Sequence, residues 1–237
     1  MVRQSPPVPM LGPLQITGQS RDHVIVREGV VLQPAAMVAF DKMCKAAAKD
    51  GIALRSASSF RDFDTQARIW NQKWRGERPL LDKAGRLLVA DELTPKARVR
   101  AILLWSAPPG ASRHHWGTDL DVYDQASLAS GQRPQLVPAE YVTGGPFADL
   151  TLWLNRHMGK FGFYRPYDTY RGGVQPEPWH LSHAPTARAA SRRMRPQTLL
   201  RALSHSQIDG KTALIADLPQ IYLRYVRSVD PAPTVLG

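Results

Sequence analysis

Residues 112–124 read SRHHWGTDLDVYD, and they gather side chains that can bind a metal ion or move protons. The adjacent residues His114 and His115 precede three aspartates, with a single glycine between the two groups. Imidazole nitrogens and carboxylate oxygens are among the ligands that zinc accepts in proteins. Three interpretations are open at this point: a polar surface loop, a patch that contacts nucleic acid, or half of a metal site. The spacing within the segment does not decide among them.

A second group of this kind lies at residues 177–180, which read EPWH. A catalytic zinc usually has three protein ligands and leaves the fourth position to water, so one ligand must come from outside the first cluster. Glu177 and His180 are separated by two residues, and Pro178 excludes a regular helix interior. Both side chains therefore reach one ion only if the chain bends locally. The HExxH helix of common metallopeptidases is absent from the sequence.

The segments that must position these side chains alternate between amphipathic helices and short strands. TDLDVYD alternates polar and apolar residues, so it predicts a strand on which Asp119 and Asp121 share one face. The mixed order favours an α+β fold, a single domain with a small antiparallel sheet and helices packed around it. We expect a hairpin within 23–32, helices at 34–51, 63–74, 95–105 and 147–162, and strands at 52–60, 118–124 and near Trp179.

The composition of the 237-residue chain is that of an ordinary folded protein with one sizeable core or two small ones. No run of eighteen apolar residues occurs, so a membrane span is not expected. The first residues, MVRQSPPVPMLGPLQITGQ, do not resemble a signal peptide. The single cysteine, Cys44, excludes an intrachain disulfide. We therefore expect a cytoplasmic protein, with a periplasmic or cell-wall-associated location as the alternative.

The net charge of +11 favours anionic partners. Much of the excess lies in one late segment without acids, which is most simply a solvated basic helix. Its arginines are Arg188, Arg192, Arg193, Arg195 and Arg201. We divide the chain into an N-terminal arm at 1–20, a central domain at 21–183 and a basic C-terminal extension at 184–237 that packs on this domain.

Three motifs in a fixed order carry a resemblance to a known family. SSFRDFDTQ at 58–66 is followed by the pattern SxHxxGxxxD at 112–121, and KFGFYRPYDTYRGGVQ then leads into EPWH. Together they resemble the zinc D-alanyl-D-alanine peptidases of the VanY and VanX type, whose fold is shared with the hedgehog signalling domain. The resemblance covers about residues 52–183, the greater part of the central domain.

The resemblance implies one zinc ion per chain, bound by His114, Asp121 and His180. It implies that Glu177 is the general base that activates water and then carries the proton to the leaving amine. Arg61 would stabilise the oxyanion of the tetrahedral intermediate, a type of contact worth about 3–4 kcal/mol in studied enzymes. The resemblance also implies that Ser112 and Gln66 contact the substrate, with Ser112 near a terminal carboxylate.

The chain departs from the family pattern two residues before the ligand aspartate, where a small residue is usual and Asp119 stands here. The motif register assigns the ligand to Asp121, and we expect Asp119 to orient a histidine or to bind nearby backbone. His115 and His183 are expected to have structural roles. Tyr164, Tyr167 and Tyr170 precede EPWH and could line the substrate groove, but no spacing selects among them.

The first functional expectation is a zinc metallopeptidase that hydrolyses bonds at D-alanine in peptidoglycan-type peptides, in the form of a D-alanyl-D-alanine carboxypeptidase. The alternatives are a peptidoglycan endopeptidase or L,D-carboxypeptidase of the same fold, or a non-catalytic zinc-bearing binding module. The expected partner is a peptidoglycan-derived peptide, and anionic cell-wall polymers fit the positive charge equally well. A nucleic-acid partner is not expected, because no recognition motif accompanies the basic segment. We expect a monomer.

Overall fold

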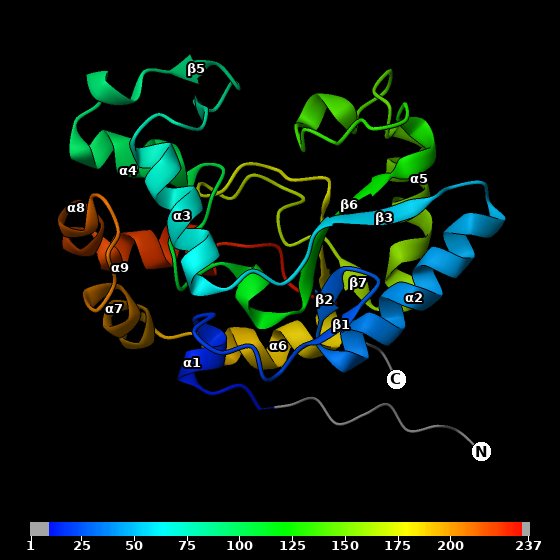
Figure 1. Cartoon of the computed structure of the whole chain (residues 1–237), viewed down its shortest axis with the longest axis horizontal. Helices are drawn as coiled ribbons and strands as arrows, with labels where there is room; N and C mark the ends of the chain where they lie inside the picture. Colours follow the sequence, from blue (N-terminus) through cyan, green and yellow to red (C-terminus); the bar gives the residue numbers. More distant parts are fainter. Residues whose placement is uncertain (1–9, 234–237) are drawn as a thin grey trace.

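The structure, a computed structural model, describes residues 10–233. A four-stranded antiparallel sheet carries the sequence motifs (Figure 1). Its strands follow the order β3 (Leu54–Ser58), β6 (Asp119–Asp124), β8 (His180–His183) and β7 (Phe163–Tyr164). Side chains alternate between the two faces of a strand, and the central strands β6 and β8 use this period to separate an apolar face from a polar one. The mixed α+β class with a small antiparallel sheet is confirmed.

The apolar face of the sheet is covered by α2 (Pro34–Lys49) and α5 (Ala148–His157) (Figure 1). A hairpin of β1 (Ile25–Arg27) and β2 (Val30–Leu32) precedes α2, and a 3₁₀ turn, η5 (Met158–Phe161), follows α5. Apolar residues recur along α2 at helical spacing, so they form one buried stripe against the sheet. The fully or nearly buried members from helix and sheet include Met37, Phe40, Met43, Leu120, Val122 and Leu181.

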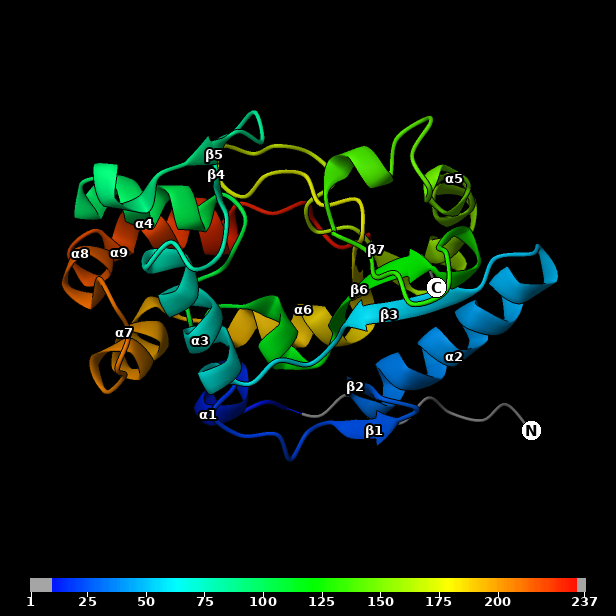
Figure 2. The ribbon, with the colours of Figure 1, turned by 45° about the horizontal axis from the view of Figure 1, so that its top comes forward.

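The remaining helices form a second hydrophobic cluster on the other side of the sheet (Figures 1 and 2). They are α1 (Pro13–Ile16), α3 (Phe63–Trp74), α4 (Pro95–Leu103), α6 (Ala184–Arg193), α7 (Pro196–Ser204), α8 (Lys211–Ala216), α9 (Leu218–Ile221) and a π-helical turn, η6 (Tyr222–Arg227). Trp70 of α3 and Leu203 of α7 are both fully buried in this cluster. One hydrophobic cluster therefore covers the apolar face of the sheet, and the other is formed by the remaining helices. A polar site can form on the polar face of the sheet, between the two clusters.

Two excursions from these layers consist of short elements. The first holds the hairpin of β4 (Leu80–Leu81) and β5 (Leu87–Leu88), followed by the 3₁₀ turn η1 (Ala90–Glu92). The second runs from η3 (Gln125–Ser127) to η4 (Pro138–Glu140). Another 3₁₀ turn, η2 (Arg113–Trp116), precedes β6 and carries the two adjacent histidines. The expected helices and strands thus form, and β7 is a short strand that the pattern did not predict.

The segment expected as an N-terminal arm is in part a piece of the folded body. Residues 1–9 lie outside the described part, but residues 13–16 form α1, and the side chains of Leu11 and Ile16 are almost completely buried. Residues 10–20 of the expected arm therefore pack on the folded body, and the division of the chain at residue 20 stays a prediction. The proline-rich composition of this segment does not indicate that Leu11 and Ile16 pack in the second cluster.

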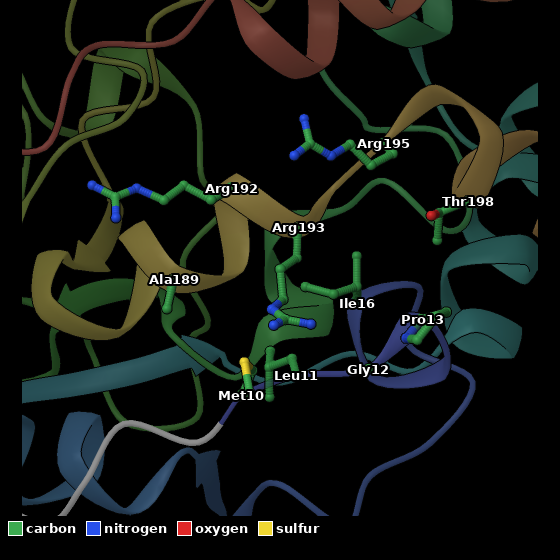
Figure 3. A pocket seen from close by; sticks show the side chains of 10 residues that line it. All are labelled: Met10, Leu11, Gly12, Pro13, Ile16, Ala189, Arg192, Arg193, Arg195 and Thr198. Carbon is green, nitrogen blue, oxygen red and sulfur yellow. The ribbon is translucent and has the colours of Figure 1, made fainter.

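The basic C-terminal segment also contributes to the core through the apolar sides of its helices. Met194 and Leu199 are buried, whereas Arg192, Arg193 and Arg195 are exposed at the turn between α6 and α7. These arginines border a pocket of about 620 Å³. Figure 3 shows the side chain of Arg193 pointing toward the N-terminal segment, while those of Arg192 and Arg195 extend in other directions. The arginines do not converge on one point, as is usual for a solvated face.

No helix within residues 10–233 is both long enough and apolar enough to cross a lipid bilayer.

Candidate active site

The strand register brings two of the expected ligands together. Asp121 on β6 lies directly opposite His180 on β8, and Asp119 lies opposite Ser182. Directly opposed residues of antiparallel strands have Cβ atoms about 5 Å apart on the same face. All four side chains therefore lie on the polar face of the sheet, while Leu120 between the aspartates points into the apolar layer.

The third expected ligand, His114, comes from the 3₁₀ turn η2 that precedes β6. Gly117 ends this turn with a left-handed backbone (φ 65°), and a Cβ atom there would come within 2.3 Å of Cγ1 of Val24. Only glycine fits both demands, which explains the glycine of the SxHxxG pattern. The sharp reversal allows His114 to reach the same face as Asp121, and His114 Nε2 lies 3.5 Å from Asp121 Oδ2.

The EPWH segment bends as a tight turn. The backbone N–H of His180 donates to the carbonyl of Glu177 (3.1 Å), and Pro178 occupies the position that favours proline in such turns. The bend places Glu177 Oε2 3.1 Å from His180 Nδ1. Glu177 therefore lies beside the cluster, and its side chain lines the same cleft.

His114, Asp121 and His180 form a cluster that can hold a metal ion. Each offers one ligand atom, these atoms lie within 4.8 Å of one another, and all three residues are buried. Asp121 Oδ1 is buried and has no hydrogen-bond partner among residues 10–233, which is costly for a carboxylate oxygen. A bound cation would satisfy this atom.

The outer nitrogens of both histidines are held by acceptors, so the inner nitrogens are free for a metal. His114 Nδ1 donates to the carbonyl of Ser59 (2.8 Å), and His180 Nε2 donates to Asp119 Oδ2 (3.0 Å). His180 Nδ1 then faces Asp121 Oδ1 (3.4 Å) and Glu177. Burial lowers the pKa of His180, but Asp119, Glu177 and Asp121 outweigh it and raise this pKa to about 10. The surroundings of Nδ1 thus favour a positive charge, which a metal ion supplies.

Asp119 is the hub of a buried network behind His180. Its carboxylate accepts from Arg113 Nε (2.7 Å) and from the hydroxyls of Thr118 and Ser182. Arg113 in turn donates to Ser182 Oγ at 2.7 Å and to the Tyr164 hydroxyl at 3.1 Å. Burial raises the pKa of Asp119, but Arg113 and His180 pull this pKa well below its ordinary range. The residue that departs from the family pattern is therefore a charged, fully paired group that fixes the His180 ring.

Replacing Asp119 with asparagine is expected to weaken metal binding about 10- to 100-fold, because this variant loses the charge that orients His180. The change also leaves Arg113 buried without a counter-charge, which typically costs about 3–5 kcal/mol of folding free energy. Competition with a chelator measures the first effect, and denaturant unfolding of the metal-free protein measures the second. Asp64→Asn, at an exposed position, is the matched control. An unchanged metal affinity in Asp119→Asn would contradict the orienting role.

Arg61 is held at the edge of the cluster by two side chains. Its guanidinium donates to Gln66 Oε1 (2.7 Å) and Ser58 Oγ (3.0 Å), and its Nη2 lies 3.9 Å from Asp121 Oδ2. Gln66 is fully buried, does not line the cleft and donates to the carbonyl of Ala107 (2.7 Å). Gln66 therefore connects Arg61 to the framework, and its expected contact with the substrate stays a prediction.

The cluster opens into a cleft of about 920 Å³. Segments of both excursions line this cleft, and the ribbons of the two excursions stand apart from each other in Figures 1 and 2. Ser112 also lines the cleft. Its hydroxyl makes no hydrogen bond within residues 10–233, so it is free to bind a ligand. Of the three tyrosines before EPWH, Tyr167 lines the cleft and packs edge-on against His180, with ring centroids 5.0 Å apart. Tyr164 binds Arg113 instead.

His115 is a structural residue, as expected. It is fully buried, its Nδ1 donates to the carbonyl of Arg61 (2.6 Å), and its Nε2 accepts from the backbone N–H of Gly110 (3.0 Å). Both ring nitrogens of the neutral form are thus satisfied. Burial is the main cause that lowers the pKa of His115 to about 3. His183 is also buried, with Nδ1 3.0 Å from Thr186 Oγ1.

The lowered pKa of His115 predicts a pH dependence of stability. The folded-state pKa lies below the unfolded value of about 6.5, so the unfolded chain binds more protons between these values. This contribution is complete above about pH 6.5 and decreases as the pH falls, by up to about 1.4 kcal/mol per unit. Unfolding of the metal-free protein between pH 7 and 5 should show a shallower slope in His115→Asn than in the wild type. Equal slopes would overturn the assignment; His205→Asn, at an exposed site, serves as control.

Comparisons with known proteins agree with this geometry. A sequence model of the family described as VanY, D-alanyl-D-alanine carboxypeptidase, matches residues 29–186, well over half of the chain. The chain belongs to the VanY family. Both histidine motifs lie within the matched range, whereas helices α7 to α9 lie beyond it. The resemblance carried by the three motifs is therefore confirmed.

Two relatives and one solved structure illustrate the range of similar proteins. An uncharacterized protein of Haemophilus influenzae is 40% identical over 118 residues, which cover 49% of this chain and 90% of that protein. A second uncharacterized protein of the same organism is 42% identical over 102 residues, 41% of this chain and 70% of that protein. The structure of a mutant vancomycin resistance D,D-pentapeptidase VanY from a VanB-type cassette, in complex with Zn(II), aligns with a TM-score of 0.50 at 20% identity. It covers 81% of this chain and 88% of the other, and supports the VanY fold.

Proposed function

We propose that this VanY-family chain is a zinc-dependent D-alanyl-D-alanine carboxypeptidase that acts on peptidoglycan-type peptides. The observation that carries the proposal is the convergence of His114, Asp121 and His180, with one carboxylate oxygen of Asp121 that lacks a hydrogen-bond partner and with Glu177 beside them in an open cleft. Two imidazoles and one carboxylate form a ligand set that suits zinc. Three protein ligands leave a coordination position open, as catalytic sites require, whereas structural zinc sites use four.

A bound zinc ion would polarise the scissile carbonyl and make water more acidic. Glu177 is placed by its turn to accept a proton from the attacking water and to return it to the leaving amine. The Arg61 guanidinium, fixed by Gln66 and Ser58, would stabilise negative charge as it develops on the carbonyl oxygen. The free hydroxyl of Ser112 would donate to the terminal carboxylate of the substrate. A binding module without catalysis would need neither Glu177 nor Arg61 in the cleft.

Hydrolysis of a defined stem pentapeptide, with products identified by mass, tests the proposal. A carboxypeptidase should release one D-alanine from the free C-terminus and be about 10- to 100-fold less active on the same peptide with a C-terminal amide. The reason is that a hydrogen-bonding group built for a carboxylate would lose its charged partner. Equal cleavage of both peptides would favour the endopeptidase alternative, and cleavage of the bond before the first D-alanine, which releases D-alanyl-D-alanine, would favour L,D-cleavage. If the zinc-loaded protein cleaves neither peptide, the alternative of a non-catalytic zinc-bearing binding module is favoured.

A further inference from the structure

Charge is distributed unevenly around the cleft. Among the described residues, the charged side chains that line it are Arg61, Lys73, Arg78, Lys83, Arg113, Asp121 and Glu177. The two acids belong to the proposed metal and proton-transfer groups, and Arg113 is neutralised by Asp119. Four cations therefore remain, and they come from the segment before α3, from α3 and from the excursion that holds β4 and β5.

Three of these four cations already have protein partners. Arg61 is bound by the two side chains described above. Arg78 Nε donates to Gln72 Oε1 at 2.7 Å. The Lys83 ammonium lies 5.5 Å from the centroid of the Tyr170 ring, within the range of a cation–π contact. Each of them is thus accounted for by the folded structure alone.

Lys73 is different because its ammonium has no partner. Within residues 10–233, no hydrogen bond or ion pair involves this group, although the residue is partly buried and lines the cleft. Burial is the main cause that lowers the pKa of Lys73 to about 8; the charge of Glu177 raises this pKa, while those of Arg78 and Arg61 lower it further. A half-desolvated cation among like charges is unfavourable, and an anion in the cleft would relieve it.

The helix that carries Lys73 explains why it points into the cleft. Gln66, Ile69 and Lys73 are spaced by three and four residues along α3, so they lie on one helix face. Gln66 at the start of this face holds Arg61, and Ile69 and Lys73 line the cleft. A cation in the last turn of a helix is favourable for the helix dipole on any face, so this effect alone does not require the cleft-facing position.

The second excursion contributes mainly apolar residues to the cleft. They are Leu136, Val137, Pro138 and Ala139, beside the polar Gln135, and Trp179 adds a further apolar surface. A peptide in the cleft would therefore meet both hydrophobic surface and positive charge. This combination fits a peptide with an acidic side chain directed toward α3.

We infer that Lys73 forms a subsite for a second carboxylate, so that the preferred substrates are peptides with an acidic side chain in addition to their C-terminal carboxylate. This inference rests on the proposed function for the peptide nature of the ligand. Arg78, which also lines the cleft, adds to the positive potential at the subsite. Lys73 is in this view a specificity-determining residue, distinct from the groups that act on the scissile bond.

Equilibrium binding in the presence of zinc tests the subsite separately from catalysis. The probes are acetyl-Glu-D-Ala-D-Ala and acetyl-Gln-D-Ala-D-Ala, and the same pair with one alanine inserted after the first residue. They are titrated calorimetrically into Glu177→Gln protein, which should not hydrolyse them. We expect the Glu peptide of at least one pair to bind about 10-fold more tightly than its Gln partner, because a charged hydrogen bond to Lys73 is gained.

Variants of the same protein assign the preference to Lys73. Adding Lys73→Met should reduce the Glu-to-Gln affinity ratio to about one, Lys73→Arg should retain a preference, and Lys45→Met, at an exposed position of α2, should leave it unchanged. Thermal unfolding checks that each variant is folded. Equal binding within both pairs, a preference that survives Lys73→Met, or no binding of any peptide would overturn the inference. If wild-type protein binds with this preference but hydrolyses none of the peptides, the proposed function fails and the subsite remains.

Discussion

Replacing Glu177 with alanine is expected to reduce turnover about 100- to 10,000-fold while the protein keeps its metal ion, because a positioned proton-transfer group contributes on this scale. Glu177 lies beside the cluster but is not one of its three ligands, and its Oε2 is 3.1 Å from His180 Nδ1. Hydrolysis of the stem pentapeptide gives kcat, and elemental analysis of the same preparation gives the metal content.

Two further variants separate proton transfer from other effects. Glu177→Gln keeps the shape and the hydrogen-bonding capacity of the side chain but cannot accept the proton, so it should be nearly as inactive as the alanine variant. Glu92→Gln, at an exposed site in η1, should retain wild-type turnover. If the Glu177 variants lose the metal together with activity, Glu177 is a metal ligand. If their turnover is unchanged, Glu177 is not the proton-transfer group.

The three members of the cluster could be named from the sequence because the family resemblance assigns them, whereas their local spacing left other interpretations open. The sequence places Asp119 and Asp121 on one face of a strand, and β6 has this face. The sequence does not contain the register that sets Asp121 opposite His180, since strands 59 residues apart pair through the whole fold. The family resemblance supplied that long-range information, and the structure supports it with an independent pairing.

Roles that depend on what a side chain touches were harder to predict. Gln66 belongs to a motif, but only the folded chain shows that both ends of its amide are used by Arg61 and Ala107. Arg113 stands next to a metal-ligand candidate, but the sequence does not single it out, because its pairing with Asp119 is recognisable only once η2 folds against β6. The sequence does not single out Lys73 either, because a lysine in the last turn of an amphipathic helix is usually solvated.

The terminal segments show the limit of composition as a guide. The arginines at the α6–α7 turn are exposed, as the basic segment suggested, but Met194, Leu199 and Leu203 on the other side are buried in the second cluster. Charge dominates the composition of this segment, while a few apolar residues at helical spacing decide its packing. The C-terminal helices are therefore part of the second hydrophobic cluster.

The protein purified without added metal is expected to contain about one zinc ion per chain, and the His114→Ala, His180→Ala double variant is expected to contain almost none. Removing both imidazoles leaves one carboxylate oxygen of Asp121, which cannot hold zinc against solvent. Activity on any confirmed substrate should disappear with the metal. A His205→Ala control, at an exposed position, should keep full metal content.

Stability provides a readout of the metal site that does not depend on activity. A ligand that binds only the folded state stabilises it by about 2.7 kcal/mol at a concentration 100 times its Kd, so chelation should lower the unfolding temperature of the wild type. The double variant should not respond to chelator, because its site no longer binds the ion. This difference follows from the Asp121 oxygen that lacks a hydrogen-bond partner and from the negative surroundings of His180 Nδ1, both of which a bound cation relieves. Full metal occupancy in the double variant, or identical chelator responses in both proteins, would show that the metal is held elsewhere.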